Sequence, residues 1–317
     1  MNGKRVLITG GSGFIGSHLV QRLLADGSEV AVLMRYGNVI KNERLNECWS
    51  KIQVIEADIR NRGALTCIRQ FDPHIVFHLA AYNHVGESFR QVEECFDVNA
   101  KGTANLLDAC EGAEKFVYVS SSEVYGHQGQ VPFLETACPN PISPYSITKY
   151  AGELYCRMKQ RMSTGQSIVI LRLFNAYGPY QSTKAIIPEV IVNCLLNRPL
   201  NTTPGKQTRE FNYIDNLLDG LIAAARHKGK LDEIINICSG EEVSIADLIE
   251  KIKKITKTKS VHDTSAPYRP NELWRLCGSN QKAKEILGWT PRIHLEEGLR
   301  RTVDWFQEYF KSHPALG

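Results

Sequence analysis

The sequence predicts an α/β protein whose first half forms a doubly wound parallel sheet. Six short apolar runs, rich in β-branched residues, are typical of strands and lie at residues 5–9, 29–34, 52–58, 75–80, 115–120 and 167–172. Helical or loop stretches separate them, and residues 88–110 place apolar side chains at helical intervals. Strands that alternate with crossovers of this length pair in parallel, and helices then cover both faces of the sheet.

A glycine-rich turn, TGGSGFIG at residues 9–16, follows the first predicted strand and opens a predicted helix. Gly10 and Gly13 let the backbone turn sharply and approach a ligand, and Gly16 lets the helix pack closely on the strand. A diphosphate can bind at such a helix N-terminus, where N–H groups and the helix dipole favour negative charge. The turn therefore predicts a Rossmann-type dinucleotide site. The alternative is a glycine-rich loop in another kind of α/β protein.

The pattern changes after about residue 176, where prolines break the chain into shorter pieces with helices expected at 185–197, 215–227, 244–256 and 295–310. We expect residues 1–176 to form the dinucleotide-binding domain. Residues 177–317 should form a smaller, mixed α/β domain that binds a second ligand at the carboxyl ends of the strands. Segments such as 210–240 should return to the first domain. Residues 231–239 are predicted to form one more strand, in either sheet.

The composition argues against several classes of protein. The 317 residues are 43% hydrophobic and 23% charged, which is ordinary for a globular chain. We find no apolar run of membrane-spanning length and no signal peptide, and expect a cytoplasmic protein. Nine scattered cysteines without a CxxC pair indicate reduced thiols and no metal site. The net charge of +4, without a basic stripe, argues against nucleic-acid binding.

The residue after the second predicted strand bears on which dinucleotide binds. An acid there accepts hydrogen bonds from the ribose 2′-hydroxyl of NAD, whereas an arginine suits the 2′-phosphate of NADP. Arg35 occupies this place, and no acid follows it in the next three residues. We therefore expect NADP, with NAD as the second choice. Asp58, which precedes Ile59 at the end of the third strand, either lies near the adenine or forms a turn.

Two short motifs carry the predicted chemistry. Tyr145 and Lys149 are four residues apart and share one face of a predicted helix. A lysine beside a tyrosine favours the phenolate, which can take a proton from an alcohol. This spacing alone occurs often by chance. The stretch SSSE at residues 120–123 ends the fifth strand, and the carboxyl ends of parallel strands share one ligand crevice.

Six segments carry a resemblance to a known family, in order along most of the chain: 9–16, 78–81 (HLAA), Asn99 with 102–103, 120–126 (SSSEVYG), 145–149 and 172–179 (RLFNAYGP). Together they resemble the nucleotide-sugar branch of the extended short-chain dehydrogenase/reductase family. The resemblance implies that Ser121 binds the sugar 4-hydroxyl and that Tyr145 and Lys149 oxidise C4. It implies cofactor contacts at Gly10, Gly13, Phe14, Ile15, Gly16, Arg35, Asp58, Ile59, Leu79, Ala80, Ala81, Asn99, Tyr145 and Lys149.

Glu123 points to the 4,6-dehydratases of this branch, since the epimerases usually carry an apolar or small residue there. Oxidation at C4 makes the C5 proton acidic, a carboxylate can remove it, hydroxide leaves from C6, and the hydride returns to C6. Ser122 stands where dTDP-glucose dehydratases have an aspartate, and here the chain is similar to GDP-mannose 4,6-dehydratases. We expect an NADP-dependent hydro-lyase with Ser121, Ser122, Glu123, Tyr145 and Lys149 as its catalytic residues.

Other readings stay open at this point. A 4-epimerase or a 5,6-dehydratase would use the same C4 oxidation. Nucleotide-sugar decarboxylases also carry the glutamate, but they usually place an arginine before the tyrosine, where this chain has Ser143 and Pro144. A binding protein that senses NADP is the non-enzymatic alternative. Glu123 itself could cap a turn or pair with a lysine.

The resemblance also implies contacts to the substrate and the formation of a homodimer. Asn175 and Arg209 resemble residues that meet the diphosphate of a nucleotide sugar, and a guanidinium suits phosphate oxygens. Arg269 and Arg275 are further candidates, and a surface ion pair is the alternative for any of the three arginines. His84 and Ser88 lie in a stretch similar to the dehydratase pattern and are candidate substrate contacts. Helices near 88–110 and 145–163 are expected to pair across a two-fold axis, giving a homodimer.

Overall fold

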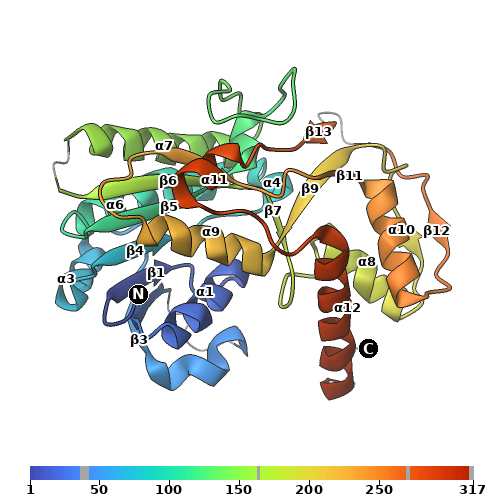
Figure 1. Cartoon of the computed structure of the whole chain (residues 1–317), viewed down its shortest axis with the longest axis horizontal. Helices are drawn as coiled ribbons and strands as arrows, with labels where there is room; N and C mark the ends of the chain where they lie inside the picture. Colours follow the sequence, from blue (N-terminus) through green and yellow to red (C-terminus); the bar gives the residue numbers. More distant parts are fainter. Residues whose placement is uncertain (36–42, 163–164, 269–271, 314–317) are drawn as a thin grey trace.

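The computed structural model describes residues 1–35, 43–162, 165–268 and 272–313. Its main sheet has seven parallel strands in the order β10–β6–β5–β4–β1–β2–β3 (Figure 1). The strands are β1 (Arg5–Thr9), β2 (Glu29–Met34), β3 (Ile52–Glu56), β4 (Ile75–His78), β5 (Lys115–Ser121), β6 (Ser167–Leu173) and β10 (Ile234–Ile237). The strand order reverses direction at β1, which opens a crevice between the ends of β1 and β4. The predicted α/β fold is confirmed.

Helices cover both faces of this sheet, because its strands bury alternate side chains on opposite sides. Val6 and Ile8 of β1 pack in one hydrophobic cluster with α1 (Phe14–Ala25) and α9 (Ile214–Arg226). Leu7 packs in a second cluster on the other face, with α3 (Ile68–Phe71), α6 (Gly102–Ala109) and α7 (Pro144–Met162). The crossovers thus fix the carboxyl ends of the strands at one edge.

The amphipathic stretch 88–110 differs in detail from the expected long helix. It follows α4 (Val85–Ser88) and consists of α5 (Val92–Phe96), a π-helical turn at Asp97–Lys101, and α6. Asn99 lies in the π turn, is buried, and makes two hydrogen bonds with the backbone of Tyr82. The extra residue of a π turn thus aims an amide at the loop that follows β4.

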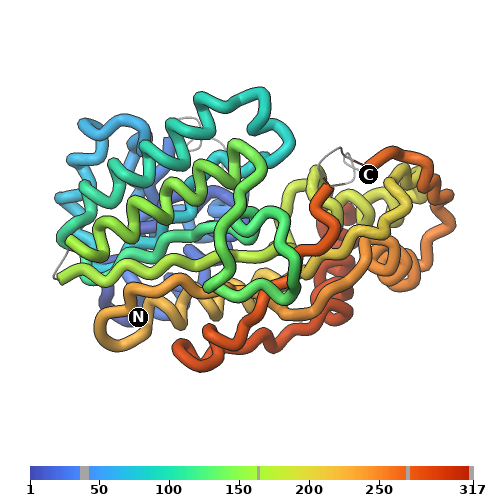
Figure 2. The backbone as a smooth tube through the Cα atoms, turned by 90° about the horizontal axis from the view of Figure 1, so that it is seen from above, coloured from blue at the N-terminus to red at the C-terminus, as the bar shows by residue number. Residues whose placement is uncertain are grey.

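Besides α9 and β10, the described part of the second half supplies two small sheets and four helices. Strand β9 (Thr208–Tyr213) pairs with β7 (Asn175–Tyr177), β11 (Glu242–Ser244) and β13 (Arg275–Leu276), and β8 (Leu200–Asn201) pairs with β12 (His262–Asp263). The helices are α8 (Ile186–Leu195), α10 (Ile245–Thr256), α11 (Gln281–Leu287) and α12 (Leu295–Ser312). Of residues 210–240, β9 lies in the small sheet, whereas α9 and β10 belong to the main layer (Figure 2).

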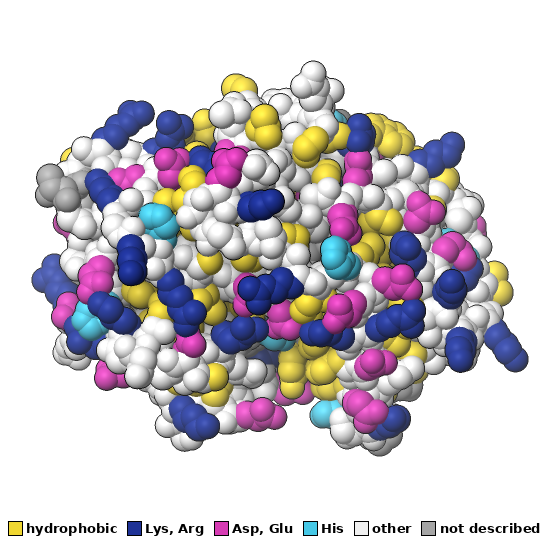
Figure 3. Space-filling view, in the orientation of Figure 1, with side chains coloured by type: hydrophobic (Ala, Val, Ile, Leu, Met, Phe, Trp, Pro, Cys, Tyr) yellow, Lys and Arg dark blue, Asp and Glu magenta, His cyan; other side chains and the backbone are white. Residues whose placement is uncertain are grey.

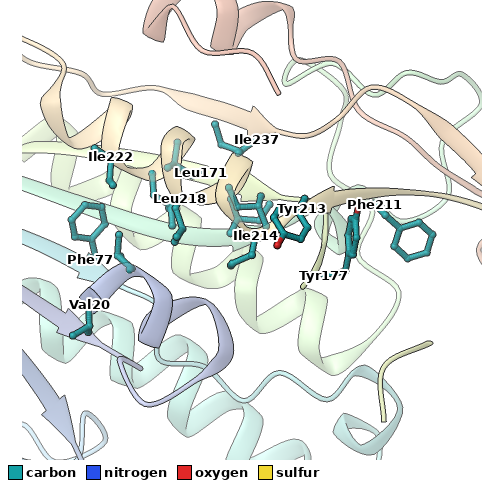
Figure 4. Close-up of a cluster of buried hydrophobic side chains, with 14 of the residues drawn as sticks. Val20, Phe77, Leu171, Tyr177, Phe211, Tyr213, Ile214, Leu218, Ile222 and Ile237 are labelled. Atoms are coloured by element: carbon teal, nitrogen blue, oxygen red, sulfur yellow. The ribbon is translucent and has the colours of Figure 1, made fainter. Parts of the chain in front are cut away.

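One hydrophobic cluster connects the two parts of the molecule. It runs from Val20 and Phe77 beside the main sheet, through Leu218 of α9, to Tyr177 and Tyr213 in the small sheet (Figure 4). The shared core holds β7 and β9 in place against the ends of the main strands. The crevice between the two parts is therefore built on packed elements.

The outer surface is mixed in charge. On the face shown in Figure 3, acidic and basic side chains alternate without a single-signed stripe. Within the described ranges, no helix combines the length and the apolar character needed to cross a membrane. Three short 3₁₀ helices, η1 (Glu43–Lys51), η2 (Gly63–Cys67) and η4 (Ser122–Tyr125), complete the elements of the described chain.

Candidate active site

The glycine turn at the end of β1 fits a dinucleotide diphosphate. Gly10 has a φ of +72°, and a Cβ there would stand 2.7 Å from the backbone nitrogen of Ala80. A Cβ at Gly16 would overlap the carbonyl oxygen of Gly10. Helix α1 then begins at Phe14, with no acidic residue in its first turn and with Gly13, which has no side chain, as its N-cap residue. The first backbone N–H groups of a helix are the donors that bind phosphate at its N-terminus.

Two adjoining cavities follow from this turn. The inner cavity, of about 310 Å³, extends from the turn to β5 and α7 and is lined by Gly10, Gly13, Phe14, Ile15, Gly16, Leu79, Ala81, Ser121, Ser122, Glu123, Tyr145 and Lys149, among others. The outer cavity, of about 970 Å³, opens toward β9 and α8. Glu123 and Asn175 line both cavities. A ligand that spans the two cavities would pass these two side chains.

Ser121, Glu123 and Tyr145 meet where β5 ends and α7 begins. The Ser121 hydroxyl accepts a hydrogen bond from the backbone N–H of Glu123 at 3.2 Å, which caps the 3₁₀ helix η4. Tyr145 lies in the first turn of α7, and its backbone N–H donates to the Ser88 hydroxyl at 3.3 Å. The three side chains line the inner cavity with Ser122, which is buried.

The protonation of Tyr145 differs from the expectation. Removal of the phenol from water raises the pKa of Tyr145 to about 12, a hydrogen bond with Ser121 acts in the opposite direction, and the charge of Glu123 raises it further. Lys149 donates its ammonium to the carbonyl of Val119 at 2.5 Å. Burial of the phenol and the nearby Glu123 carboxylate therefore favour the neutral phenol over the phenolate.

The buried Lys149 ammonium lies close to an aromatic ring and to an acidic residue. Its ammonium lies 4.4 Å from the centroid of the Tyr118 ring, a favourable cation–π distance. Burial lowers the pKa of Lys149 to about 8, and the charge of Glu153 one helical turn later opposes this shift. The ammonium form is therefore retained near neutral pH. It remains a donor inside the inner cavity.

The loop after β4 is fixed by a buried histidine. Thr103 donates to the carbonyl of Asn99 at 2.6 Å, so it accepts from His78 Nε2 at 2.9 Å. His78 Nδ1 then accepts from the Thr9 hydroxyl at 2.7 Å, and Thr9 in turn accepts from the Ala80 N–H at 3.2 Å. Burial lowers the pKa of His78 to about 3, in agreement with this neutral ring. The network positions Leu79, Ala80 and Ala81 beside the glycine turn.

Five of the predicted cofactor residues lie outside the inner cavity lining: Arg35, Asp58, Ile59, Ala80 and Asn99. Asn99 and Ala80 act through the hydrogen bonds just described. Ile59 is buried in the core behind the turn, and Asp58 binds the Arg60 guanidinium at 2.6 Å. Arg35 is 56% exposed, and its guanidinium stands 3.8 Å from the Glu94 carboxylate. The expected NADP-selecting arginine thus faces an acid of α5.

The predicted substrate residues divide into two groups. Asn175 and Arg209 line the outer cavity, where Arg209 donates to the Glu272 carboxylate at 2.7 Å. His84 is exposed, and Arg275 pairs with Glu242 on the surface; neither His84 nor Arg275 lines the inner or the outer cavity. Ser88 is buried beneath α7 and is also absent from both linings. Arg269 lies outside the described residues.

Sequence reasoning missed most of the outer cavity lining, including Asn83, Phe89, Phe211 and Glu272. Phe211 could have been found, because it lies two residues from Arg209 on β9 and alternate strand residues share a face. Asn83 and Phe89 neighbour the predicted His84 and Ser88, but the turn of α4 aims different side chains at the cavity. The sequence around Glu272 offered no periodic signal. Among the described residues, no group of acids, histidines and cysteines is arranged to hold a metal.

Comparison with known proteins places this site in a family. The family model described as "GDP-mannose 4,6 dehydratase" matches residues 7–302. A putative UDP-glucose 4-epimerase of Methanocaldococcus jannaschii is 34% identical over 95% of this chain and 98% of its own. The dTDP-D-glucose 4,6-dehydratase of Homo sapiens is 32% identical over 97% and 91%, respectively. A UDP-N-acetyl-alpha-D-glucosaminuronate decarboxylase of Bacillus cytotoxicus is 33% identical over 96% and 98%.

Solved structures agree with the sequence relatives. The UDP-glucose 4-epimerase of Thermotoga maritima with UDP-glucose superposes with a TM-score of 0.89 at 32% identity, covering 96% of this chain and 99% of that one. The UDP-glucuronic acid 4-epimerase of Bacillus cereus, in complex with UDP-glucuronic acid and NAD, gives 0.85 at 32% identity with the same coverage. The chain therefore belongs to the GDP-mannose 4,6 dehydratase family, extended short-chain dehydrogenase/reductase enzymes that act on nucleotide sugars with a nicotinamide dinucleotide.

Proposed function

We propose that the protein is an NADP-dependent nucleotide-sugar 4,6-dehydratase. The main observation in support of this proposal is the position of Glu123. Its side chain lines both cavities, and its charge raises the pKa of the Tyr145 phenol. A carboxylate at this place can act on the sugar carbon next to the oxidised one. An epimerase has no need of a base there, because it only removes and returns a hydride at C4.

The proposed roles follow from what each side chain contacts. Ser121 orients the sugar 4-hydroxyl, and Tyr145 takes its proton while Lys149 remains a cationic donor beside it. When bound, the dinucleotide supplies the hydride acceptor for C4, the hydride donor for C6 and a positive charge that favours the phenolate. Glu123 removes the C5 proton, which leaves with the C6 hydroxyl as water, and a solvent-derived proton returns to C5. Ser122 contributes a hydroxyl beside the leaving group.

The cofactor and diphosphate assignments rest on arginines. Arg35 at the end of β2 supports NADP, since a guanidinium suits the 2′-phosphate. Arg209, with Asn175 beside it in the outer cavity, is proposed to meet the substrate diphosphate by exchanging Glu272 for phosphate oxygens. Arg269 and Arg275 stay candidates for the same role, as do His84 and Ser88 for sugar contacts.

A homodimer is proposed on the basis of an apolar surface on α5 and α7. Val92 and Phe96 are each 43% exposed, and Leu154 and Met158 are 48% and 40% exposed. Exposed apolar side chains on two neighbouring helices are typical of a buried helix–helix interface. Pairing of this face with its copy would cover them.

The second candidate function is a 4-epimerase, which the relatives from Methanocaldococcus jannaschii and Thermotoga maritima favour. It would use Ser121, Tyr145 and Lys149 in the same way, but would leave Glu123 without a chemical role. The two reactions therefore differ in what Glu123 does.

The test combines a substrate panel with Glu123→Gln. Wild-type enzyme is incubated in deuterated water with each of GDP-mannose, dTDP-glucose, UDP-N-acetylglucosamine and UDP-glucose. The masses of the products are measured by mass spectrometry. We expect one substrate to lose a water and gain one solvent deuterium. Glu123→Gln should slow water loss about 10²- to 10⁴-fold while cofactor reduction persists. The control is Glu111→Gln, at an exposed glutamate after α6. Products of unchanged formula, or normal turnover by Glu123→Gln, would refute the dehydratase.

A further inference from the structure

Four linked charged side chains lie near the end of β2, where a Rossmann-type fold places the adenosine ribose of its dinucleotide. Arg60 binds Asp58 through Nε at 3.0 Å and Nη2 at 2.6 Å, and it binds Glu94 Oε2 through Nη1 at 2.6 Å. Glu94 Oε1 stands 3.8 Å from Arg35. Glu94, from α5, therefore lies between an arginine that is firmly bound and one that is loosely held.

The two arginines, Arg60 and Arg35, differ in how firmly their carboxylate partners hold them. The Nε, Nη1 and Nη2 atoms of Arg60 all donate to carboxylates, and its backbone turn is held by Asn105, whose amide donates to the Ile59 carbonyl at 2.9 Å. Among the described residues, Arg35 makes one ion-pair contact, the 3.8 Å approach to Glu94, and its side chain is 56% exposed. Arg35 is thus the cation that can reorient toward a ligand at the end of β2.

The position of Arg35 makes its partner important for the cofactor. The residue after the second strand meets the 2′ substituent of the adenosine ribose, which is a hydroxyl in NAD and a phosphate in NADP. Glu94 offsets the charge of Arg35, and its own charge repels a phosphate bound there. A neutral hydroxyl is insensitive to that repulsion and can donate to a carboxylate.

We infer that Glu94 is a specificity-determining residue, which weakens selection of NADP over NAD by holding Arg35 in a carboxylate pair. The inference rests on the proposed dinucleotide site and goes beyond it by naming a residue on a separate helix, 59 positions from Arg35 by the numbering. The chain should therefore accept both dinucleotides, with a preference that this one pair sets.

The experiment measures binding selectivity. Wild type and Glu94→Gln are equilibrated with NADP⁺ and NAD⁺ in equal excess, and the bound dinucleotides are released and quantified by mass spectrometry. We expect the bound NADP⁺ to NAD⁺ ratio to rise about three- to tenfold in Glu94→Gln, and the rise to shrink in high salt. Arg60 keeps its hydrogen bonds to Asp58 in Glu94→Gln, so this substitution leaves no unpaired buried charge.

Two further variants separate the proposed pair from a general charge effect. Asp97→Asn removes an acid three positions later, whose partner is Lys101 at 3.3 Å, and it should leave the ratio unchanged. In an Arg35→Gln background, Glu94→Gln should no longer raise the ratio. The inference is overturned by an unchanged ratio in Glu94→Gln, by an equal rise in Asp97→Asn, or by a rise that persists without Arg35.

The outcome is separable from that of the dehydratase proposal. Dinucleotide competition needs no sugar nucleotide, so an enzyme that proves to be an epimerase can still show the Glu94 effect. Conversely, a confirmed dehydratase with an unchanged ratio in Glu94→Gln would overturn this inference alone. Failure of the wild type to bind either dinucleotide would overturn both.

Discussion

Arg172 with Glu153, and Arg275 with Glu242, join the same two chemical groups in opposite surroundings. The first pair lies between β6 and α7 with side chains that are 1% and 0% exposed, at 2.7 Å. The second lies on the small sheet with side chains that are 59% and 20% exposed. Breaking a buried pair leaves an uncompensated charge in a low dielectric, whereas water screens an exposed pair. The same contact therefore has a different structural consequence in each region.

The buried pair stands directly behind the catalytic elements. Ser120, next to Ser121, donates to Glu153 at 2.5 Å, and the Arg172 guanidinium lies 4.5 Å from the centroid of the Tyr125 ring. The pair thus connects β5, η4, β6 and α7. Arg209 with Glu272 is an intermediate case, 17% and 12% exposed, on the wall of the outer cavity. Fixed pairs lie where proton transfer is proposed, and exchangeable ones lie where a diphosphate is proposed to bind.

The largest effect is expected at the buried pair. Arg172→Met should lower the free energy of unfolding by about 3–5 kcal/mol, because Glu153 would stay buried without its cation. The double variant Arg172→Met with Glu153→Leu should recover most of this loss, since it removes both charges and keeps the volume filled. Urea denaturation of wild type, both single variants and the double variant measures the cycle. Additive losses in the double variant would contradict the contrast between the two regions.

Glu210 extends the comparison of buried and exposed carboxylates. This carboxyl group is buried, but backbone groups rather than a cation hold it. It accepts from the N–H groups of Ser239 and Gly278, each at 2.7 Å, and so connects β9 to the segments after β10 and β13. Burial raises the pKa of Glu210 to about 7, from an ordinary value near 4.5. The folded state therefore binds a proton between these pH values that the unfolded state has released.

The sign of the pH dependence follows from this shift. Protonated Glu210 makes its whole contribution to the free energy of unfolding below about pH 4.5. This contribution decreases by roughly 3 kcal/mol in total as the pH rises to about 7. Glu210→Gln should remove this component, so its stability should fall less than that of wild type between pH 5 and pH 7. Denaturation midpoints at several pH values, in one buffer series, test this. Parallel curves for the two proteins would mean that Glu210 is ionised throughout the range.

Local patterns predicted the cofactor end of the site. The glycine turn and the Tyr145–Lys149 spacing are short-range features, because strand, turn and helix geometry fix where such neighbours lie. The carboxyl end of β5 carries Glu123 to the cavity for the same reason. Contacts between distant segments were not readable. Glu94 meets Arg35 through the packing of α5, and Ser88 is turned inward, where its hydroxyl accepts a hydrogen bond from the Tyr145 N–H.

The direction of one pKa also required the structure. The sequence placed a lysine four residues from Tyr145 and implied a lowered phenol pKa. The folded chain instead raises the pKa of Tyr145 to about 12, mainly by desolvation and with a contribution from Glu123. Burial is a sum over the whole surroundings of a group, so no spacing rule reports it. The same holds for Arg172 and Arg275, which look alike as sequence letters.

The smallest effect is expected at the exposed pair on the small sheet. Arg275→Gln should lower the free energy of unfolding by about 0–1 kcal/mol, because water already solvates much of the guanidinium and side-chain ordering offsets the attraction. Glu242 also keeps a hydrogen bond from the Thr208 hydroxyl, so the variant leaves it partnered. Urea denaturation at low and high salt should show this small difference shrinking further. A loss near that of Arg172→Met would mean that the small sheet depends on Arg275 as the main sheet depends on Arg172, and burial would then not be what separates the two pairs.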